Sequence, residues 1–255
     1  MINLKKSILF LFINLETLQT IATLNGHTNW ILSVAVLRNG NACSGSNGDI
    51  KIWDTTSNAL IGSLFGHTDW VDSLLGLSDG NLVSGSSDRT IKIWDVETKT
   101  TIGTLIGHTS GVRSLALLPN NNLISGSSDR SIKIWDLVTK TSLATLIGHT
   151  GAVYALVTLP NGNFLSGSSD RTIKHWAWDG TAYSVIATLA GHTGSVWTLA
   201  LLPNGNLISG SDDGTIRIWD LRTNTAVSTI SGNNGIVWSL AVFQNGNFVR
   251  LNNLI

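Results

Sequence analysis

Charged residues are scarce in this chain of 255 residues. Asp, Glu, Lys and Arg make up 13% of it, about half of the roughly 25% found in an ordinary globular protein. The 16 Lys and Arg residues balance the 16 Asp and Glu residues, so the formal net charge is zero. Nucleic acids and anionic membranes attract proteins through concentrated positive charge, so we expect neither as a partner.

Cysteine and the common catalytic motifs are also scarce. Cys43 is the single cysteine, which excludes an internal disulfide and fits a reducing, cytoplasmic location. The sequence has no Cys-x-x-Cys pair, no His-Glu-x-x-His motif, no Gly-x-Ser-x-Gly elbow and no phosphate-binding Gly-Lys-Ser/Thr loop. His175 interrupts an apolar strand pattern, but no second ligand stands at metal-binding spacing. We therefore expect no metal, no cofactor and no enzymatic activity.

An internal repeat dominates what is present. The stretch from Gly66 to Asp95, GHTDWVDSLLGLSDGNLVSGSSDRTIKIWD, recurs at spacings of 40, 41, 41, 43 and 41 residues. Its opening pair appears as Gly26-His27, Gly66-His67, Gly107-His108, Gly148-His149 and Gly191-His192, with Gly232-Asn233 as a damaged sixth copy. Its closing pair appears as Trp53-Asp54, Trp94-Asp95, Trp135-Asp136 and Trp219-Asp220, whereas Trp176-Ala177 departs from it. A period of about 40–45 residues with these two signatures is typical of four-stranded propeller blades.

The chain thus resembles the WD-repeat β-propeller family, and the resemblance implies an all-β fold of antiparallel blades. Over residues 1–255 we expect a single propeller domain, monomeric within a larger complex. Whole blades are expected at residues 29–65, 69–106, 110–147, 151–190 and 194–231, and a sixth is expected to combine residues 235–255 with residues 7–25. Such a shared blade would leave no free sheet edge. The alternative is a truncated seven-bladed propeller, a fragment of a longer protein.

The first thirteen residues allow two interpretations. Lys5 and Lys6 precede a short apolar run, as in a signal peptide. Residues 14–27, however, match residues 136–149 without a gap, which puts the apolar run where a third strand stands in the other repeats. This register favours a strand.

The turn after the first strand of each repeat carries an Asn-Gly or Asp-Gly pair. These pairs are Asn39-Gly40, Asp79-Gly80, Asn161-Gly162, Asn204-Gly205 and Asn245-Gly246. They predict two-residue hairpin turns between antiparallel strands. Asn121 replaces the glycine in the third repeat, and asparagine also tolerates positive φ.

Histidine, serine, aspartate and tryptophan recur together in four repeats. The sets are His67, Ser84, Asp88 and Trp94; His108, Ser125, Asp129 and Trp135; His149, Ser166, Asp170 and Trp176; and His192, Ser209, Asp213 and Trp219. A hydrolase triad needs one such constellation at a cleft, and a fourfold repetition at the period of the fold favours a structural role. The resemblance implies a buried hydrogen-bond chain from indole through hydroxyl and imidazole to carboxylate. In the first repeat Asn47-Gly48 stands where Ser-Asp-Arg stands elsewhere, so His27 is expected to lack its carboxylate.

By the same resemblance, positions three and five after the repeat histidine face a partner-binding top surface, as does the residue before the turn aspartate. The expected surface comprises Trp30, Leu32, Trp70, Asp72, Arg113, Tyr154, Trp197, Ile236 and Trp238, with Ser87, Ser128, Ser169 and Asp212 between them. Tryptophan, tyrosine and arginine are common binding hot spots. Alternatively, some of these tryptophans only pack between neighbouring blades.

The expected function is therefore that of a non-catalytic scaffold that binds a peptide or protein partner on its top face. Two alternatives remain at this point. One is a substrate- or ubiquitin-recognising subunit of a degradation complex, and the other is a propeller-based hydrolase.

Overall fold

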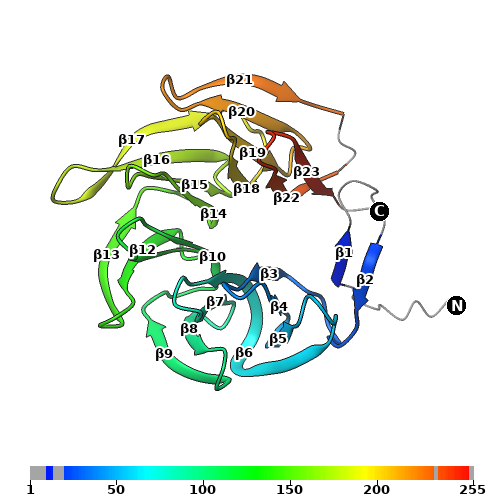
Figure 1. The fold of residues 1–255 in the computed structure, drawn as a ribbon. Helices are drawn as coiled ribbons and strands as arrows, with labels where there is room; N and C mark the ends of the chain where they lie inside the picture. Colours follow the sequence, from blue (N-terminus) through cyan, green and yellow to red (C-terminus); the bar gives the residue numbers. More distant parts are fainter. Residues whose placement is uncertain (1–9, 14–19, 233–234, 253–255) are drawn as a thin grey trace, which may run out of the picture. The chain divides into compact units, whose positions relative to one another are not determined.

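The computed structural model describes residues 10–13, 20–232 and 235–252, and all regular structure in them is β-strand (Figure 1). The chain forms two compact units, residues 1–112 and 113–255. Within each sheet, neighbouring strands are consecutive in the chain, and the pairings are antiparallel. The expectation of an all-β, antiparallel fold is thus confirmed.

The first unit holds a two-stranded and a seven-stranded sheet. Strands β1 (Phe10–Ile13) and β2 (Thr20–Leu24) form the small sheet. The large sheet runs in chain order through β3 (Ser33–Val36), β4 (Ala42–Gly45), β5 (Asn47–Trp53), β6 (Leu60–Gly76), β7 (Leu82–Ser86), β8 (Thr90–Asp95) and β9 (Thr100–Ile106). Strand β6 is 17 residues long, and it belongs to two consecutive four-stranded arrays, β3–β6 and β6–β9. Its first part pairs with β5 and its last part with β7.

The second unit repeats the four-stranded array three times. The arrays are β10 (Val112–Leu117), which starts at the last residue of the first unit, with β11 (Leu123–Ser127), β12 (Ser131–Asp136) and β13 (Thr141–Ile147); β14 (Val153–Thr158), β15 (Phe164–Ser168), β16 (Thr172–Trp178) and β17 (Tyr183–Ala190); and β18 (Val196–Leu201), β19 (Leu207–Ser211), β20 (Ile216–Asp220) and β21 (Thr225–Ile230). Strands β22 (Val237–Val242) and β23 (Phe248–Asn252) form a final pair.

The turns with Asn-Gly pairs differ from the expectation. In the first repeat the Leu37 N–H donates to Asn41 O at 2.8 Å and the Gly40 N–H to Leu37 O at 2.9 Å. These bonds enclose three loop residues, and Gly40 has positive φ while Asn39 does not. The predicted two-residue turn is therefore wrong. Asn39 instead accepts a bond from the Asn41 N–H through Oδ1, so the turn glycine alone needs the left-handed conformation. Asn121 takes that conformation in the third repeat, with φ of 65°.

Neighbouring sheets pack through a repeated contact between a glycine and a valine. In the second unit a Cβ at Gly126 would lie 2.6 Å from Val153 Cγ1, and one at Gly167 would lie 2.7 Å from Val196 Cγ1. The same relation joins Gly45 to Val71 in the first unit. Because a β-carbon does not fit there, the Ser-Gly-Ser strand of each repeat lets the next sheet approach closely.

Strand β1 covers residues 10–13, so these residues are extended as the strand interpretation requires. Residues 1–9, 14–19 and 253–255 of the expected shared blade lie outside the described residues. Sheet β1–β2 belongs to the first unit and sheet β22–β23 to the second. Their combination into one blade, and with it the number of blades, remains a prediction.

Candidate functional site

The second repeat shows how the recurring polar residues are connected. Trp94 Nε1 donates to Ser84 Oγ at 2.7 Å, Ser84 Oγ lies 2.7 Å from His67 Nε2, and His67 Nδ1 lies 2.7 Å from Asp88 Oδ2. An indole N–H can only donate, so the serine oxygen accepts it and gives its own hydrogen to His67 Nε2. The proton of the neutral ring is then on Nδ1 and is donated to Asp88.

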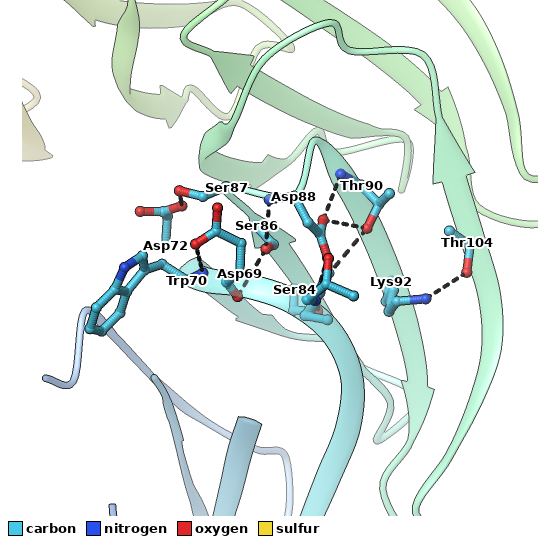
Figure 2. A network of polar contacts seen from close by, with 12 residues as sticks. Asp69, Trp70, Asp72, Ser84, Ser86, Ser87, Asp88, Thr90, Lys92 and Thr104 are labelled. Atoms are coloured by element: carbon cyan, nitrogen blue, oxygen red, sulfur yellow. Dashed lines mark hydrogen bonds and ion pairs between the residues drawn. The ribbon is translucent and has the colours of Figure 1, made fainter. Parts of the chain in front are cut away.

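The carboxylate at the end of this chain has further partners. Asp88 accepts bonds from the Thr90 N–H and hydroxyl at 2.9 and 2.7 Å, and from the Thr68 N–H at 3.1 Å. Figure 2 shows Ser84 on β7, Thr90 on β8 and Asp88 in the turn between them. The turn before β8 is therefore fixed to the strand that carries the histidine.

Burial and hydrogen bonding set the protonation of this pair. Burial lowers the pKa of His67 and of His192, and their carboxylate partners offset this only in part. Burial alone would raise the pKa of Asp88, but the bonds from Thr90 and His67 outweigh it and hold the pKa at about 2. The folded protein thus keeps a neutral imidazole beside a charged carboxylate.

The fourth and fifth repeats have the same geometry. His149 lies 2.7 Å from both Asp170 and Ser166, and Trp176 donates to Ser166 at 2.8 Å. The fifth repeat joins His192, Asp213, Ser209 and Trp219 at 2.7–2.8 Å. In the third, Trp135 donates to Ser125 at 2.8 Å, and Asp129 accepts the Ser131 N–H and hydroxyl at 2.9 and 2.6 Å.

The first repeat corrects the expectation that His27 lacks a carboxylate. His27 Nδ1 lies 3.2 Å from Asp49 Oδ1, and His27 Nε2 lies 2.7 Å from Ser44 Oγ. Counted back from the closing tryptophan, Asp49 stands where Thr90 stands in the second repeat. The shorter turn has lost its aspartate, and Asp49, the third residue of β5, supplies the carboxylate instead.

The histidines of these sets are poorly placed to act in acyl transfer. The histidines at the openings of repeats two to five are only 5–6% exposed. In His67, His149 and His192 both ring nitrogens are already bonded within their own repeat. A hydrolase instead needs a serine and histidine that meet the substrate. Among the described residues, no group of three or more His, Cys, Asp or Glu side chains is arranged to hold a metal ion, and no helix there is long and apolar enough to cross a bilayer.

The residues expected on the top surface are distributed over both units. In the first unit Trp30 and Leu32 are 54% and 44% exposed. Trp70 is half-buried, and the Ser87 hydroxyl donates to Asp72 at 2.7 Å. Figure 2 shows Trp70, Asp72 and Ser87 at one end of the second array, away from Thr104.

In the second unit three of the expected residues form a contiguous aromatic row. The rings of Tyr154 and Trp197 stack with centroids 4.0 Å apart and planes at 13°, and Trp238 meets Trp197 at 4.5 Å. They come from strands β14, β18 and β22, the first strand of each successive sheet. Each ring is half-buried, so part of its surface remains accessible. We use the term aromatic row for Tyr154, Trp197 and Trp238.

Polar side chains of the expected surface are also hydrogen-bonded in this unit. The Trp197 indole N–H donates to Asp212 Oδ1, and Arg113 Nε donates to Ser128 Oγ at 2.8 Å. Ile236 and Ser169 are half-buried. Sequence reasoning identified these positions by their offsets from the repeat histidine but gave no indication that the three rings touch. That contact depends on how closely neighbouring sheets approach.

Comparisons with known proteins agree with this fold. The family model for the WD domain, G-beta repeat, matches residues 18–54, 58–95, 99–136, 140–177 and 183–220. The chain therefore belongs to the WD40 repeat family and has its β-propeller fold.

A solved structure gives the same assignment. The crystal structure of the WD40 beta propeller domain of Doa1 matches with a TM-score of 0.80 and 26% identity over 90% of this chain and 77% of that chain. No curated protein matches. Because 1640 chains of solved structures match in total, the fold by itself does not select a function.

Proposed function

We propose that this protein is a non-catalytic interaction module that binds a peptide or protein partner through the aromatic row. WD40 propellers generally serve as interaction modules, and the resemblance first pointed to these positions. The observation that carries the proposal is the stack of Tyr154, Trp197 and Trp238, whose rings are in contact yet only half-buried.

The row has the physical properties of a binding hot spot. Stacking and the bond from Trp197 to Asp212 restrict the rings before a partner arrives. A partner that covers them therefore loses little additional side-chain entropy. Large aromatic side chains also contribute most to affinity when they are fully desolvated at the centre of an interface.

The buried polar sets support the non-catalytic part of the proposal. The same set recurs in successive repeats, and His67, His149 and His192 each use both ring nitrogens inside their own repeat. A hydrolase would require one of them to turn towards substrate. We also propose that the protein is cytoplasmic and works as a monomeric propeller within a larger complex.

The test compares proteins captured by the wild type with those captured by Trp197→Ala and Trp238→Ala. Val227→Ala is the control, because Val227 is a 55% exposed apolar residue in the same unit, outside the row. We expect partners that are lost with both row variants and kept with the control, while all variants remain folded at the temperature of the assay. Identical partner sets for all four proteins would refute the proposal.

A narrower proposal, motivated by the use of WD-repeat proteins in degradation complexes, is that the row recognises ubiquitin or a degradation substrate. Titration of the purified protein with ubiquitin separates this from the general case. It predicts a shift of the Trp197 indole resonance that is lost in Trp238→Ala. If ubiquitin leaves that resonance unmoved, direct ubiquitin recognition by the row is excluded.

A further inference from the structure

The fourth repeat contains an insertion that the fold does not need. Its closing segment reads Trp176-Ala177-Trp178-Asp179 where the third repeat reads Trp135-Asp136. After the closing tryptophan, the third repeat has one cross-strand pair, Asp136 with Thr141. The fourth has two, Ala177 with Ser184 and Trp178 with Tyr183. Two extra residues have therefore extended the β16–β17 hairpin by one pair, and that pair is aromatic.

Contacts with the β14–β15 hairpin hold this added pair in place. The Trp178 and Tyr183 rings lie 5.1 Å apart at 53°, and Tyr183 also meets the buried Phe164 at 5.2 Å. The Tyr183 hydroxyl donates to Gly162 O at 2.9 Å. Tyr183 is thus anchored to the β14–β15 turn, while Trp178 remains 50% exposed.

The two rings form one wall of a groove between the sheets β10–β13 and β14–β17, which are neighbours in the second unit (Figure 1). The groove has a volume of about 730 Å³. Its floor is apolar core, with Leu118, Ile134 and Leu146 at most 9% exposed. Pro119 and Pro160, from the two neighbouring turns, complete the lining. Its size lies within the range of roughly 300–1,000 Å³ typical of ligand sites.

Three N–H groups among the lining residues are hydrogen-bond donors without a partner in the described part of the chain. Asn120 Oδ1 and Asn161 Oδ1 already accept the N–H groups of Asn122 and Asn163, each at 3.1 Å. This fixes the orientation of both amides and leaves their Nδ2 groups without a partner in the described part of the chain. The Trp178 indole N–H has none there either. Of the described residues that line the groove, none is charged.

An uncharged groove with an aromatic wall and surplus donors is complementary to one kind of peptide. Proline-rich segments are apolar, carry carbonyl acceptors at every residue and have few N–H groups of their own. They are also pre-extended in the polyproline II conformation, so binding orders them at low entropic cost. Aromatic-lined grooves are the usual receptors for such segments. A charged peptide would find no counter-ion among the lining residues.

We propose that this groove is a second binding site, separate from the aromatic row, and that it takes a proline-rich segment of a partner protein. The prolines pack against Trp178 and Tyr183, and the Trp178, Asn120 and Asn161 N–H groups donate to peptide carbonyls. The proposal does not depend on the function proposed for the aromatic row.

The test is a titration of the full chain with a ten-residue oligoproline, followed by the ¹H–¹⁵N resonances of the tryptophan indoles. The Trp178 resonance is identified by its absence in Trp178→Phe. We expect it to shift on titration while the Trp197 resonance stays in place. A Gly-Ser peptide of equal length is the control ligand and should shift neither.

Two sets of variants separate the aromatic wall from the donors. Trp178→Ala should weaken oligoproline binding by about tenfold or more. Asn120→Asp with Asn161→Asp keeps the acceptor oxygen of each turn but removes the donor, and Asp79 already serves in that role in the second repeat. This double variant should also bind more weakly, at unchanged melting temperature, whereas Trp197→Ala should bind like the wild type.

Two results would overturn the proposal: no oligoproline binding by the wild type, whether or not an apolar dye is taken up, or undiminished binding by Trp178→Ala. Neither of them bears on the aromatic row, because that site is tested by partners lost with Trp197→Ala. The two proposals can therefore fail independently.

Discussion

His27 and Asp49 are joined in the first repeat by a contact of 3.2 Å between Nδ1 and Oδ1. Asp49 also lies 3.1 Å from Lys51 Nζ. In the second repeat the corresponding histidine uses the turn residue Asp88, which the Thr90 hydroxyl supports. In the first repeat, Asp49 therefore stands at the position of Thr90 but provides the carboxylate that Asp88 provides in the second. Its carboxylate has fewer backbone donors but gains an ammonium partner.

This relationship predicts unequal costs for removing the two carboxylates. Asp49→Ala should lower the free energy of unfolding by about 1–2 kcal/mol, because it leaves the His27 ring nitrogen unpaired. Asp88→Ala should cost more, since it also removes the acceptor for Thr68 and Thr90. Urea unfolding of both variants measures the difference. An Asp49→Ala protein as stable as the wild type would show that His27 does not depend on this residue.

The repeat period and the residue types of the polar sets were readable from the sequence because each set recurs at fixed offsets. The role of Asp49 was not, because a deletion in the turn moved the carboxylate out of alignment. Counted backwards from Trp53, Asp49 falls at the position of Thr90, so its contact with His27 becomes apparent only in the structure. The turn geometry was misjudged for a similar local reason. An Asn-Gly pair fits both a two-residue and a three-residue loop, and the choice depends on the register of the flanking strands.

The site was only partly predictable. Offsets from the histidine identified Tyr154, Trp197 and Trp238 one by one, but their stacking depends on the glycine–valine contacts that set the distance between sheets. The groove beside Trp178 was missed, although the extra aromatic was visible. The sequence feature that indicated the groove was the length of the fourth repeat, which is two residues longer than its neighbours. A two-residue insertion in a hairpin adds one cross-strand pair and keeps the register of the rest.

Acid should destabilise the protein in two stages. Burial lowers the pKa of His67, with a smaller contribution from Lys92, and His192 behaves alike. The unfolded chain therefore binds these imidazole protons more tightly, so stability falls as the pH drops below about 6.5. The pKa of Asp88 is about 2 in the folded protein against an ordinary 3.8. Its contribution is present above about pH 4 and is lost as the pH falls towards 2.

Urea unfolding at a series of pH values between 8 and 2 measures both stages. Asp88→Asn keeps an acceptor oxygen but cannot titrate, so it should reduce the second stage. If the free energy of unfolding stayed constant between pH 7 and 5, the claim that folding lowers the pKa of His67 and His192 would be wrong.

The close approach of sheets at Gly126 predicts a strong penalty for a single methyl group. A Cβ there would lie 2.6 Å from both Ser114 Oγ and Val153 Cγ1. Gly126→Ala should therefore destabilise the protein by about 1–3 kcal/mol through overpacking. Gly62→Ala is the matched control, because its Cβ would meet the flexible end of Lys99 at 2.7 Å. Thermal unfolding should separate the two variants, and an equal melting temperature would mean that the sheets can move apart without cost.

His175 predicts a substitution that does not destabilise. It is 6% exposed and stands where the other repeats have an isoleucine. Its Nδ1 lies 2.9 Å from Asn224 Oδ1, whereas its Nε2 is buried without a partner among the described residues. A buried polar atom left unpaired costs about 1–3 kcal/mol.

His175→Ile removes that cost together with one hydrogen bond, which is worth about 1 kcal/mol net. The variant should therefore be as stable as the wild type or more so in urea unfolding, with Asn224→Ala in the wild-type background as the control for the lost bond. A clear loss of stability in His175→Ile beyond that of Asn224→Ala would mean that Nε2 has a partner, such as an ordered water molecule, that the isoleucine displaces.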